Sequence, residues 1–186
     1  MFPLTLLPLP GELVPLHIFE PRYKELLRDT EVSDASFGIY FSHEINAGKL
    51  GSLMKLETIL KRYESGELDI VVKCEDIFNL DILYRTFKNK PYPGGEIMMW
   101  NVANDHYLEG PLTELFMQYL SLRKIRRQTS FTVFQMATEL NLDLADRYKF
   151  LTADPEKKEV ILLNRLKFLI HALQVELSSK DVFHLN

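Results

Sequence analysis

The sequence is poor in cysteine and lacks an unbroken apolar run. Cys74 is the single cysteine among 186 residues, which excludes an intramolecular disulfide and a multi-cysteine zinc site. The longest apolar stretch, residues 160–177, is interrupted by asparagine, arginine, lysine, histidine and glutamine, which are costly in hydrocarbon. We therefore expect a protein of a reducing compartment, the cytoplasm, without a membrane partner.

Signals for secretion and for phosphate binding are also missing. Residues 1–15 are apolar, but no basic segment precedes them and prolines interrupt them, which argues against a signal peptide. The sequence has no Gly-x-x-x-x-Gly-Lys-Ser/Thr loop that could cradle a nucleotide. Its net charge of −4 gives no general attraction to nucleic acid. We predict no cofactor and no nucleic-acid partner.

The first half of the chain has the two-residue period of β-strands. Up to about residue 102, alternating or β-branched runs such as 37–41 and 69–74 are separated by glycine, proline, asparagine and aspartate. Residues 53–63 alternate similarly, with Leu60 on the apolar side and Ile59 as the exception. Gly66 predicts a hairpin turn after them, and Pro21 predicts the start of one short helix.

The second half has the 3.6-residue period of helices. Apolar residues recur at this spacing over 112–120, 133–140 and 144–151. The Asp-Pro-Glu sequence at 154–156 then predicts the start of a long helix. This helix has two apolar stripes, one containing Leu162 and Leu166 and one containing Phe168 and Val175. They predict packing against three other helices, with a dimerisation surface as the alternative.

These periods predict the α+β class. We expect a β-rich twisted sheet or pseudo-barrel over residues 1–105. A helical bundle with one long terminal helix should follow over residues 106–186, and the two parts together should form one domain.

The most specific motif is a proline-rich segment that runs into Leu-His-Ile-Phe-Glu-Pro-Arg-Tyr, within residues 7–27. It resembles the opening signature of the N-terminal domain of Lon proteases, and a later Phe-Gly pair of that family follows in order. Residues 48–56, 66–72 and 142–151 are similar to later parts of the same domain. Residues 74–78 depart from it, because they lack the family's usual glycine and arginine. The signature residues, which we expect to have structural roles, are Pro15, His17, Phe19, Glu20, Pro21, Arg22, Tyr23, Phe37 and Gly38.

Few residues suggest catalysis. His17 and Glu20 are three apart in a predicted strand-to-helix corner, without a further ligand at metal-binding spacing, so we expect no metal site. We predict instead that Glu20 and Arg22 satisfy polar groups at this corner, while Phe19 and Tyr23 fill the core.

Two nucleophile candidates and one basic cluster have simple structural explanations. Cys74 is expected to be a buried, inert thiol. Ser178 and Ser179 beside Lys180 lie near a helix end without a pocket that could exclude water. The basic residues within 123–127 are expected to lie at a helix C-terminus, where cations suit the helix dipole; binding of acidic peptides or RNA is the alternative.

One strand is a candidate for recognising extended peptides. Such recognition needs an exposed apolar surface or a free strand edge. Met98 and Trp100 share a face of the strand predicted at 96–102, and Tyr92 lies on the nearby proline-glycine loop. Core packing is the alternative role for these side chains.

The resemblance implies a protein- or peptide-binding module, an adaptor or regulator in proteolysis, that is not itself an enzyme. In Lon proteases this domain recognises substrates and precedes an ATPase module and a serine-lysine protease domain, and the sequence shows the motifs of neither. The alternatives are a hydrolase and a receptor for a small ligand in a cleft between the halves. Homo-oligomerisation is left open.

Overall fold

The computed structural model describes residues 1–102, 107–125 and 130–183, the last four of these without side-chain detail. The chain divides into two compact units, Met1–Asn104 and Asp105–Asn186. The first unit contains all six strands and one helix of the described chain, and the second contains four helices. The α+β class predicted from the sequence is confirmed.

The N-terminal unit is built on one mixed, open sheet. Its strands lie in the order β1-β3-β4-β5-β2, and β6 pairs with another stretch of β5. β1 is parallel to β3, and the other pairs are antiparallel. The sheet does not close on itself, so the twisted-sheet form of the prediction is correct and a closed barrel is not. The strands are β1 (Phe2–Leu4), β2 (Leu13–Ile18), β3 (Phe37–Phe41), β4 (Leu50–Arg62), β5 (Leu68–Tyr84) and β6 (Gly94–Met99).

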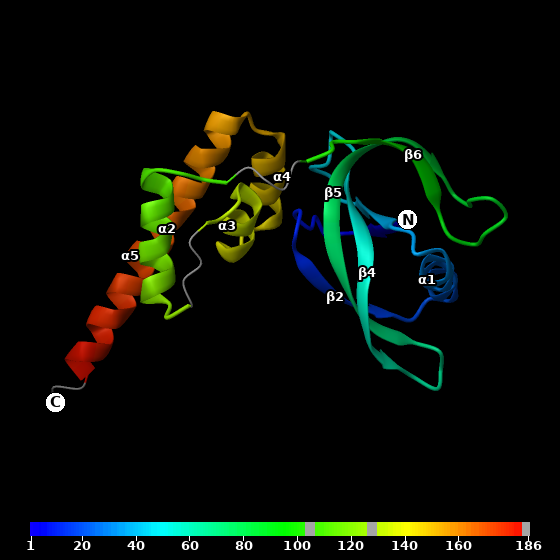
Figure 1. Cartoon of the computed structure of the whole chain (residues 1–186), viewed down its shortest axis with the longest axis horizontal. Helices are drawn as coiled ribbons and strands as arrows, with labels where there is room; N and C mark the ends of the chain where they lie inside the picture. Colours follow the sequence, from blue (N-terminus) through cyan, green and yellow to red (C-terminus); the bar gives the residue numbers. More distant parts are fainter. Residues whose placement is uncertain (103–106, 126–129, 184–186) are drawn as a thin grey trace. The chain divides into compact units, whose positions relative to one another are not determined.

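β5 organises the sheet because it pairs with three strands. One side of β5 pairs with β4 from Leu68 to Asn79, while the other side pairs first with β2 and later with β6. Figure 1 shows β4 and β5 curving together through this unit. Pairing irregularities lie between Leu56 and Thr58 and between Ile59 and Lys61. They explain the broken alternation in this segment, and Leu60 is exposed, contrary to its expected place on the apolar side.

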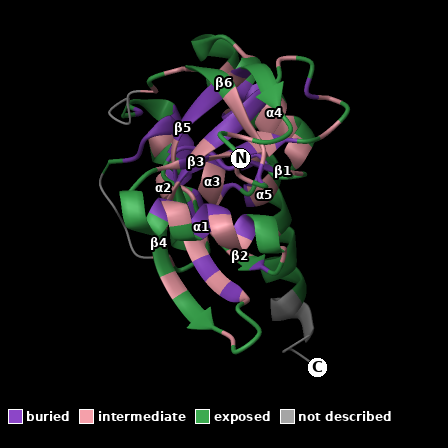
Figure 2. Cartoon of the chain, turned by 90° about the vertical axis from the view of Figure 1, so that its right-hand side faces the viewer, coloured by how far each residue is buried: buried purple, intermediate pink, exposed green. Residues whose placement is uncertain are grey.

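The predicted hairpin and helix are present. Gly66 has a φ of +78° in the turn between β4 and β5, a conformation that glycine adopts without steric cost. Helix α1 (Pro21–Ser33) begins at the expected proline. It buries Tyr23, Leu26 and Leu27 against the sheet, and the central strands are buried while the far end of β4 is exposed (Figure 2).

The core of this unit is rich in phenylalanine. Phe2, Phe41 and Phe78 are fully buried. The ring of Phe78 lies so close to Gly38 and Gly51 that a Cβ atom at either position would crowd it. These two glycines let neighbouring strands carry a large ring where the sheet bends.

The C-terminal unit contains four helices: α2 (Pro111–Leu122), α3 (Val133–Glu139), α4 (Leu144–Thr152) and α5 (Pro155–Phe183). Thr132 forms a capping box with Gln135 at the start of α3, and the Asp143 side chain caps α4. Pro111 and Pro155 occupy first-turn positions, as predicted. Asn141, between α3 and α4, has a φ of 48°, which ends the first of these helices.

The long helix α5 buries one of its two apolar stripes. It contacts α2, α3 and α4, with Leu162, Leu166 and Ile170 buried. Phe168 and Val175 of the second stripe are exposed, so the expectation that both stripes pack among three helices is correct for one. Among the described residues, no helix is both long enough and apolar enough to cross a bilayer.

Candidate peptide-binding site

The β5–β6 hairpin places Met98 and Trp100 on one face. Met98 is opposite Asn79 in the register, and the backbone N–H of Trp100 donates to the Ile77 carbonyl at 2.9 Å. The indole N–H of Trp100 donates to the Asn79 side-chain oxygen, while the Asn79 amide nitrogen donates to the Gly48 carbonyl at 2.7 Å. Trp100 is thus held in a fixed orientation and remains half-buried, so the shared face that the sequence predicts is present.

Two further side chains extend this face. Ile82 is opposite Glu96, and directly opposed residues of an antiparallel pair project on the same side, as do residues two apart in a strand. Tyr84 therefore joins Ile82 and Met98. We call Ile82, Tyr84, Met98 and Trp100 the hairpin patch.

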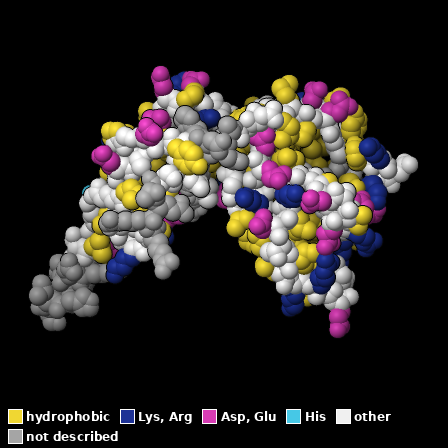
Figure 3. All heavy atoms as spheres, viewed as in Figure 1, with side chains coloured by type: hydrophobic (Ala, Val, Ile, Leu, Met, Phe, Trp, Pro, Cys, Tyr) yellow, Lys and Arg dark blue, Asp and Glu magenta, His cyan; other side chains and the backbone are white. Residues whose placement is uncertain are grey.

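The hairpin patch is a solvent-facing apolar surface. Ile82 and Tyr84 are exposed, and Met98 is 70% exposed, which is unusual for so apolar a side chain. The Tyr84 hydroxyl donates to Glu96 Oε1 at 2.5 Å, and this hydrogen bond to a carboxylate raises the pKa of Tyr84. Glu96, the charged residue of β6 on this face, is thereby bound by a tyrosine of the patch. In Figure 3, hydrophobic side chains of the N-terminal unit gather around a hollow in its surface.

The opposite face of β6 borders a pocket of about 290 Å³. Ile97 is opposite Leu80 and Met99 is opposite Phe78, so these side chains point to the core side. We call this cavity the α1–β6 pocket. It is lined by Met1, Leu26, Asp29, Thr30, Ser33, Ala35, Ser36, Phe37, Gly38, Leu53, Phe78, Phe87, Tyr92, Pro93, Gly94, Gly95 and Ile97.

The polar side chains that line the α1–β6 pocket are already engaged. The Thr30 and Ser33 hydroxyls donate to helix carbonyls, and the Ser36 hydroxyl donates to Glu75 at 2.6 Å. Asp29 accepts from Lys90 and Tyr92. The surface that remains for a ligand is therefore mainly apolar.

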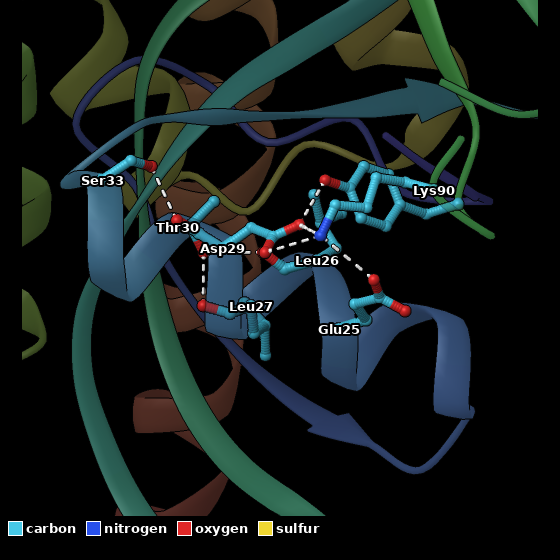
Figure 4. Close-up of polar contacts among 8 residues, drawn as sticks. Glu25, Leu26, Leu27, Asp29, Thr30, Ser33 and Lys90 are labelled. Carbon is cyan, nitrogen blue, oxygen red and sulfur yellow. Dashed lines mark hydrogen bonds and ion pairs between the residues drawn. The ribbon is translucent and has the colours of Figure 1, made fainter. Parts of the chain in front are cut away.

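A polar latch joins α1 to the loop that leads into β6 (Figure 4). Lys90 Nζ lies 3.1 Å from Glu25 Oε1 and 2.8 Å from Asp29 Oδ2, and the Tyr92 hydroxyl donates to Asp29 Oδ2 at 2.6 Å. Hydrogen bonds from Lys90 and Tyr92 lower the pKa of Asp29. Burial, followed by the bond to Asp29, raises the pKa of Tyr92 to about 12. Tyr92 is thus buried in the latch, and it forms part of the wall of the α1–β6 pocket.

The end of β6 is fixed by a buried carboxylate. Asp76 is buried and accepts the backbone N–H groups of Ile77, Asn101 and Val102 at 2.8 to 3.0 Å. Asn101 has a φ of 53°, so the chain turns sharply away from the sheet there. Asp76 therefore holds the strand end beside Trp100.

His17 of β2 belongs to a small cluster with Asp69 of β5 and Tyr63, which lies in the turn between β4 and β5. Its Nδ1 lies 2.6 Å from Asp69 Oδ1, and the Tyr63 hydroxyl donates to Asp69 Oδ2 at 2.6 Å. These contacts lower the pKa of Asp69, with Tyr63 as the larger cause. Among the described residues, no group of three or more histidine, cysteine, aspartate or glutamate side chains could hold a metal ion.

The strand-to-helix corner differs from expectation at one residue. Glu20 and Arg22 pair with each other at 2.7 Å, and Tyr23 is buried, as predicted. Phe19, however, is 59% exposed and stacks on the His17 ring instead of filling the core. The reason is that Ile18 takes the inward position at the end of β2, which turns the next side chain outward.

The remaining signature residues lie in the sheet and at the start of α1. Pro15 lies in β2 opposite Val71. Phe37 is buried at the start of β3 and packs edge-on to Phe2. Gly38 makes room for the Phe78 ring, and Pro21 begins α1.

The candidate nucleophiles are one buried thiol and two exposed hydroxyls. Cys74 is buried, as predicted, and burial raises its thiol pKa to about 12. Ser178 and Ser179 are exposed on α5, and their hydroxyls donate to carbonyls of their own helix; the Lys180 side chain lies outside the described part.

The basic cluster is partly described. Arg123 donates to the Tyr119 hydroxyl at 2.9 Å and to Glu139 at 3.2 Å, just after the end of α2. Residues 126–129 lie outside the described residues. Arg123 therefore has partners within its own helical unit.

The chain was compared with family models, curated proteins and solved structures. No family model and no curated protein matches the chain in sequence. The crystal structure of a Lon N-terminal domain protein from Xanthomonas campestris is similar, with a TM-score of 0.64 and 23% identity over 91% of this chain and 95% of that chain. The N-terminal domain of a Mycobacterium avium complex Lon protease gives a TM-score of 0.49 and 14% identity, covering 94% and 96% of the two chains.

The chain therefore has the α+β fold of the Lon N-terminal domain, as its sequence motifs predict.

Proposed function

We propose that this chain is a protein-binding module that recognises extended or unfolded polypeptides through the hairpin patch, without a catalytic step of its own. The observation that carries the proposal is the exposed apolar face of Ile82, Tyr84, Met98 and Trp100. The Lon-like fold supports it, because the sequence resemblance implies substrate recognition. We extend this to a role as adaptor or regulator in proteolysis, and to a cytoplasmic location.

The chemistry of the hairpin patch suits varied partners. Methionine is flexible and polarisable, and aromatic rings contribute large contact areas. Trp100 is fixed through Asn79, whereas Met98 is free to adapt its rotamer. Such a surface favours apolar segments without demanding one sequence.

Tyr92 has a supporting role in this proposal. Its hydroxyl is bound to Asp29 and its ring is buried, so Met98 and Trp100 provide the contact with the partner. Tyr92 holds the loop from which β6 starts. The signature residues of β2, β3 and α1 stabilise the sheet that carries the hairpin.

The test uses a permanently unfolded probe. Purified protein is immobilised and offered reduced, carboxymethylated α-lactalbumin, with the native protein as comparison. We expect retention of the unfolded form and about tenfold weaker binding by Met98→Glu, since losing one buried methionine contact costs about 1.5 kcal/mol.

Val32→Glu is the matched control. Val32 is 85% exposed on α1 and lies outside the hairpin patch, so the same change there should leave binding intact. Absence of retention above the bare matrix would end the proposal, as would equal losses in both variants. Probe cleavage abolished by a single point substitution would instead indicate an enzyme.

A further inference from the structure

The three edge strands of the sheet differ in their proline content. Among the described residues, β1 pairs with β3 alone, and β2 and β6 each pair with β5 alone. β1 contains Pro3 and β2 contains Pro15, whereas β6 contains no proline. Proline removes a backbone donor and blocks the addition of a further strand.

Pro15 lies at a position of β2 where its nitrogen points to the free edge, so that the missing N–H prevents pairing there. The Cys74 N–H donates to the Glu12 carbonyl, which therefore faces β5. Backbone groups of successive strand residues point to opposite sides, so the nitrogen of Pro15 faces away from β5. The free side of β2 is closed to main-chain pairing at this position.

β6 presents the opposite situation. The Trp100 N–H points to β5. Because backbone groups alternate, the N–H and C=O groups of Met98 also point to β5. Ile97 and Met99 therefore direct their N–H and C=O groups away from it. β6 carries one charged side chain, Glu96, which is bound to Tyr84, and it has no lysine to repel an approaching strand.

We infer that an extended segment of a partner protein adds to the free edge of β6 as a further strand. This deepens the proposed function, on which it rests, by specifying how the partner is held. Alternate side chains of the added strand reach the two faces of the sheet. One set lies along the hairpin patch, and the other points toward the α1–β6 pocket beside Ile97.

The pocket indicates the chemistry of the partner. Its polar side chains have partners within the chain, as described above, so the entering group gains most if it is apolar. A volume of about 290 Å³ accommodates one large side chain. The inferred partner is thus an extended segment with apolar residues at alternate positions, and an aromatic residue suits the pocket.

The first experiment removes one outward N–H group. Ile97→Pro deletes this donor while the pairing with β5 does not require it, and Ile97→Ala removes the side chain but keeps the donor. The probe is a short fluorescent peptide that alternates phenylalanine with threonine and ends in lysine. We expect Ile97→Pro to bind about tenfold more weakly than Ile97→Ala, since one main-chain hydrogen bond is lost and the strand approach is blocked.

The second experiment leaves the protein unchanged, so it holds even if Ile97→Pro fails to fold. Backbone amides of the peptide are N-methylated either at the phenylalanines or at the threonines. In an added strand, one of these two sets faces β6. Methylation of that set should abolish binding, while methylation of the other set should leave most of it.

The outcomes separate this inference from the proposed function. If unfolded protein is retained but both methylated peptides bind equally, or Ile97→Pro equals Ile97→Ala, strand addition is wrong and the hairpin patch binds by side chains alone. If sedimentation shows a dimer that Ile97→Pro dissociates without loss of peptide binding, β6 pairs with a second copy and the inference is also overturned.

Discussion

Cys74 shows how strongly its surroundings alter a single side chain. The thiol is 1% exposed, and its sulfur lies 3.5 Å from the carbonyl oxygens of Pro8 and Asp76. Because the thiolate is the reactive form, a rise in pKa from 9.0 to about 12 lowers its population at neutral pH by about a thousandfold. Burial and protonation thus both suppress reaction.

We expect Cys74 to react with Ellman's reagent only when the protein unfolds. The measurement is the rate of thiol labelling in buffer and in guanidinium chloride. Ser178→Cys, at an exposed position of α5, provides the matched accessible thiol and should react at once. Labelling of native Cys74 at the rate of that introduced thiol would contradict the buried placement.

Gly51 is the second residue with a specific structural demand. A Cβ atom there would overlap the Phe78 ring and lie 2.7 Å from the Ile39 carbonyl oxygen. Gly51→Ala should therefore lower the free energy of unfolding by about 1–3 kcal/mol or more, the usual cost of overpacking a core. Urea denaturation measures the change.

Phe78→Leu tests the cause of that loss. A shorter side chain leaves space beside β4, so adding Gly51→Ala to Phe78→Leu should cost less than adding it to the natural sequence. Equal costs in the two backgrounds would mean that the ring is not what excludes the methyl group.

Among the elements, the loop between β5 and β6 depends on its polar latch. Asp29 keeps its charge through bonds from Lys90 and Tyr92, which lower its pKa. A lowered carboxyl pKa contributes stability above the ordinary value of 3.8, and this contribution is lost as pH falls through the lowered pKa. The raised pKa of Tyr92 acts at the other extreme, where its contribution is lost between pH 10 and about 12.

Tyr92→Phe should cost about 0.5–1.5 kcal/mol at neutral pH, the net value of one hydrogen bond. The difference from the natural protein should shrink in acid, when Asp29 is protonated. Urea titrations over a pH series measure it. Tyr84→Phe, which removes an exposed bond to Glu96, is the control and should cost less; an equal cost for both would show that the latch is unimportant.

Elements marked by proline or glycine could be predicted from the sequence, and the irregular strand could not. Pro21, Pro111 and Pro155 each begin a helix as expected, because proline restricts φ whatever its tertiary surroundings. Leu60 was placed on the wrong side because it is skipped in the pairing with β5, at the irregularity between Ile59 and Lys61. Alternation along one strand does not reveal a bulge that depends on its neighbour.

The candidate site could be predicted in part for a similar reason. Met98 and Trp100 share a face because they are two apart, which needs no partner strand. Ile82 and Tyr84 were missed, since joining them to Met98 requires the β5–β6 register. Tyr92 was predicted to lie on a loop near the strand, and its hydrogen bond to Asp29, 63 positions away in the sequence, could not be predicted.

At the scale of the whole molecule, we propose that the N-terminal unit is a folding unit in its own right. Phe2, Phe41 and Phe78 are buried within it, and its six strands form one hydrogen-bonded sheet. A fragment of residues 1–104 should show β-rich circular dichroism, dispersed amide resonances and one cooperative thermal transition. A fragment that binds a hydrophobic dye and melts without a transition would contradict this.

The prolines of β1 and β2 have a consequence for assembly. A sheet that accepts a further strand at only one edge can bind the end of a growing fibril but offers no second edge from which the fibril could continue. When β6 pairs with the end of a β-rich aggregate, the edges that remain free are β1 and β2, where Pro3 and Pro15 prevent main-chain hydrogen bonds. Molecules docked in this manner would behave as chain terminators, and substoichiometric amounts would slow fibre elongation.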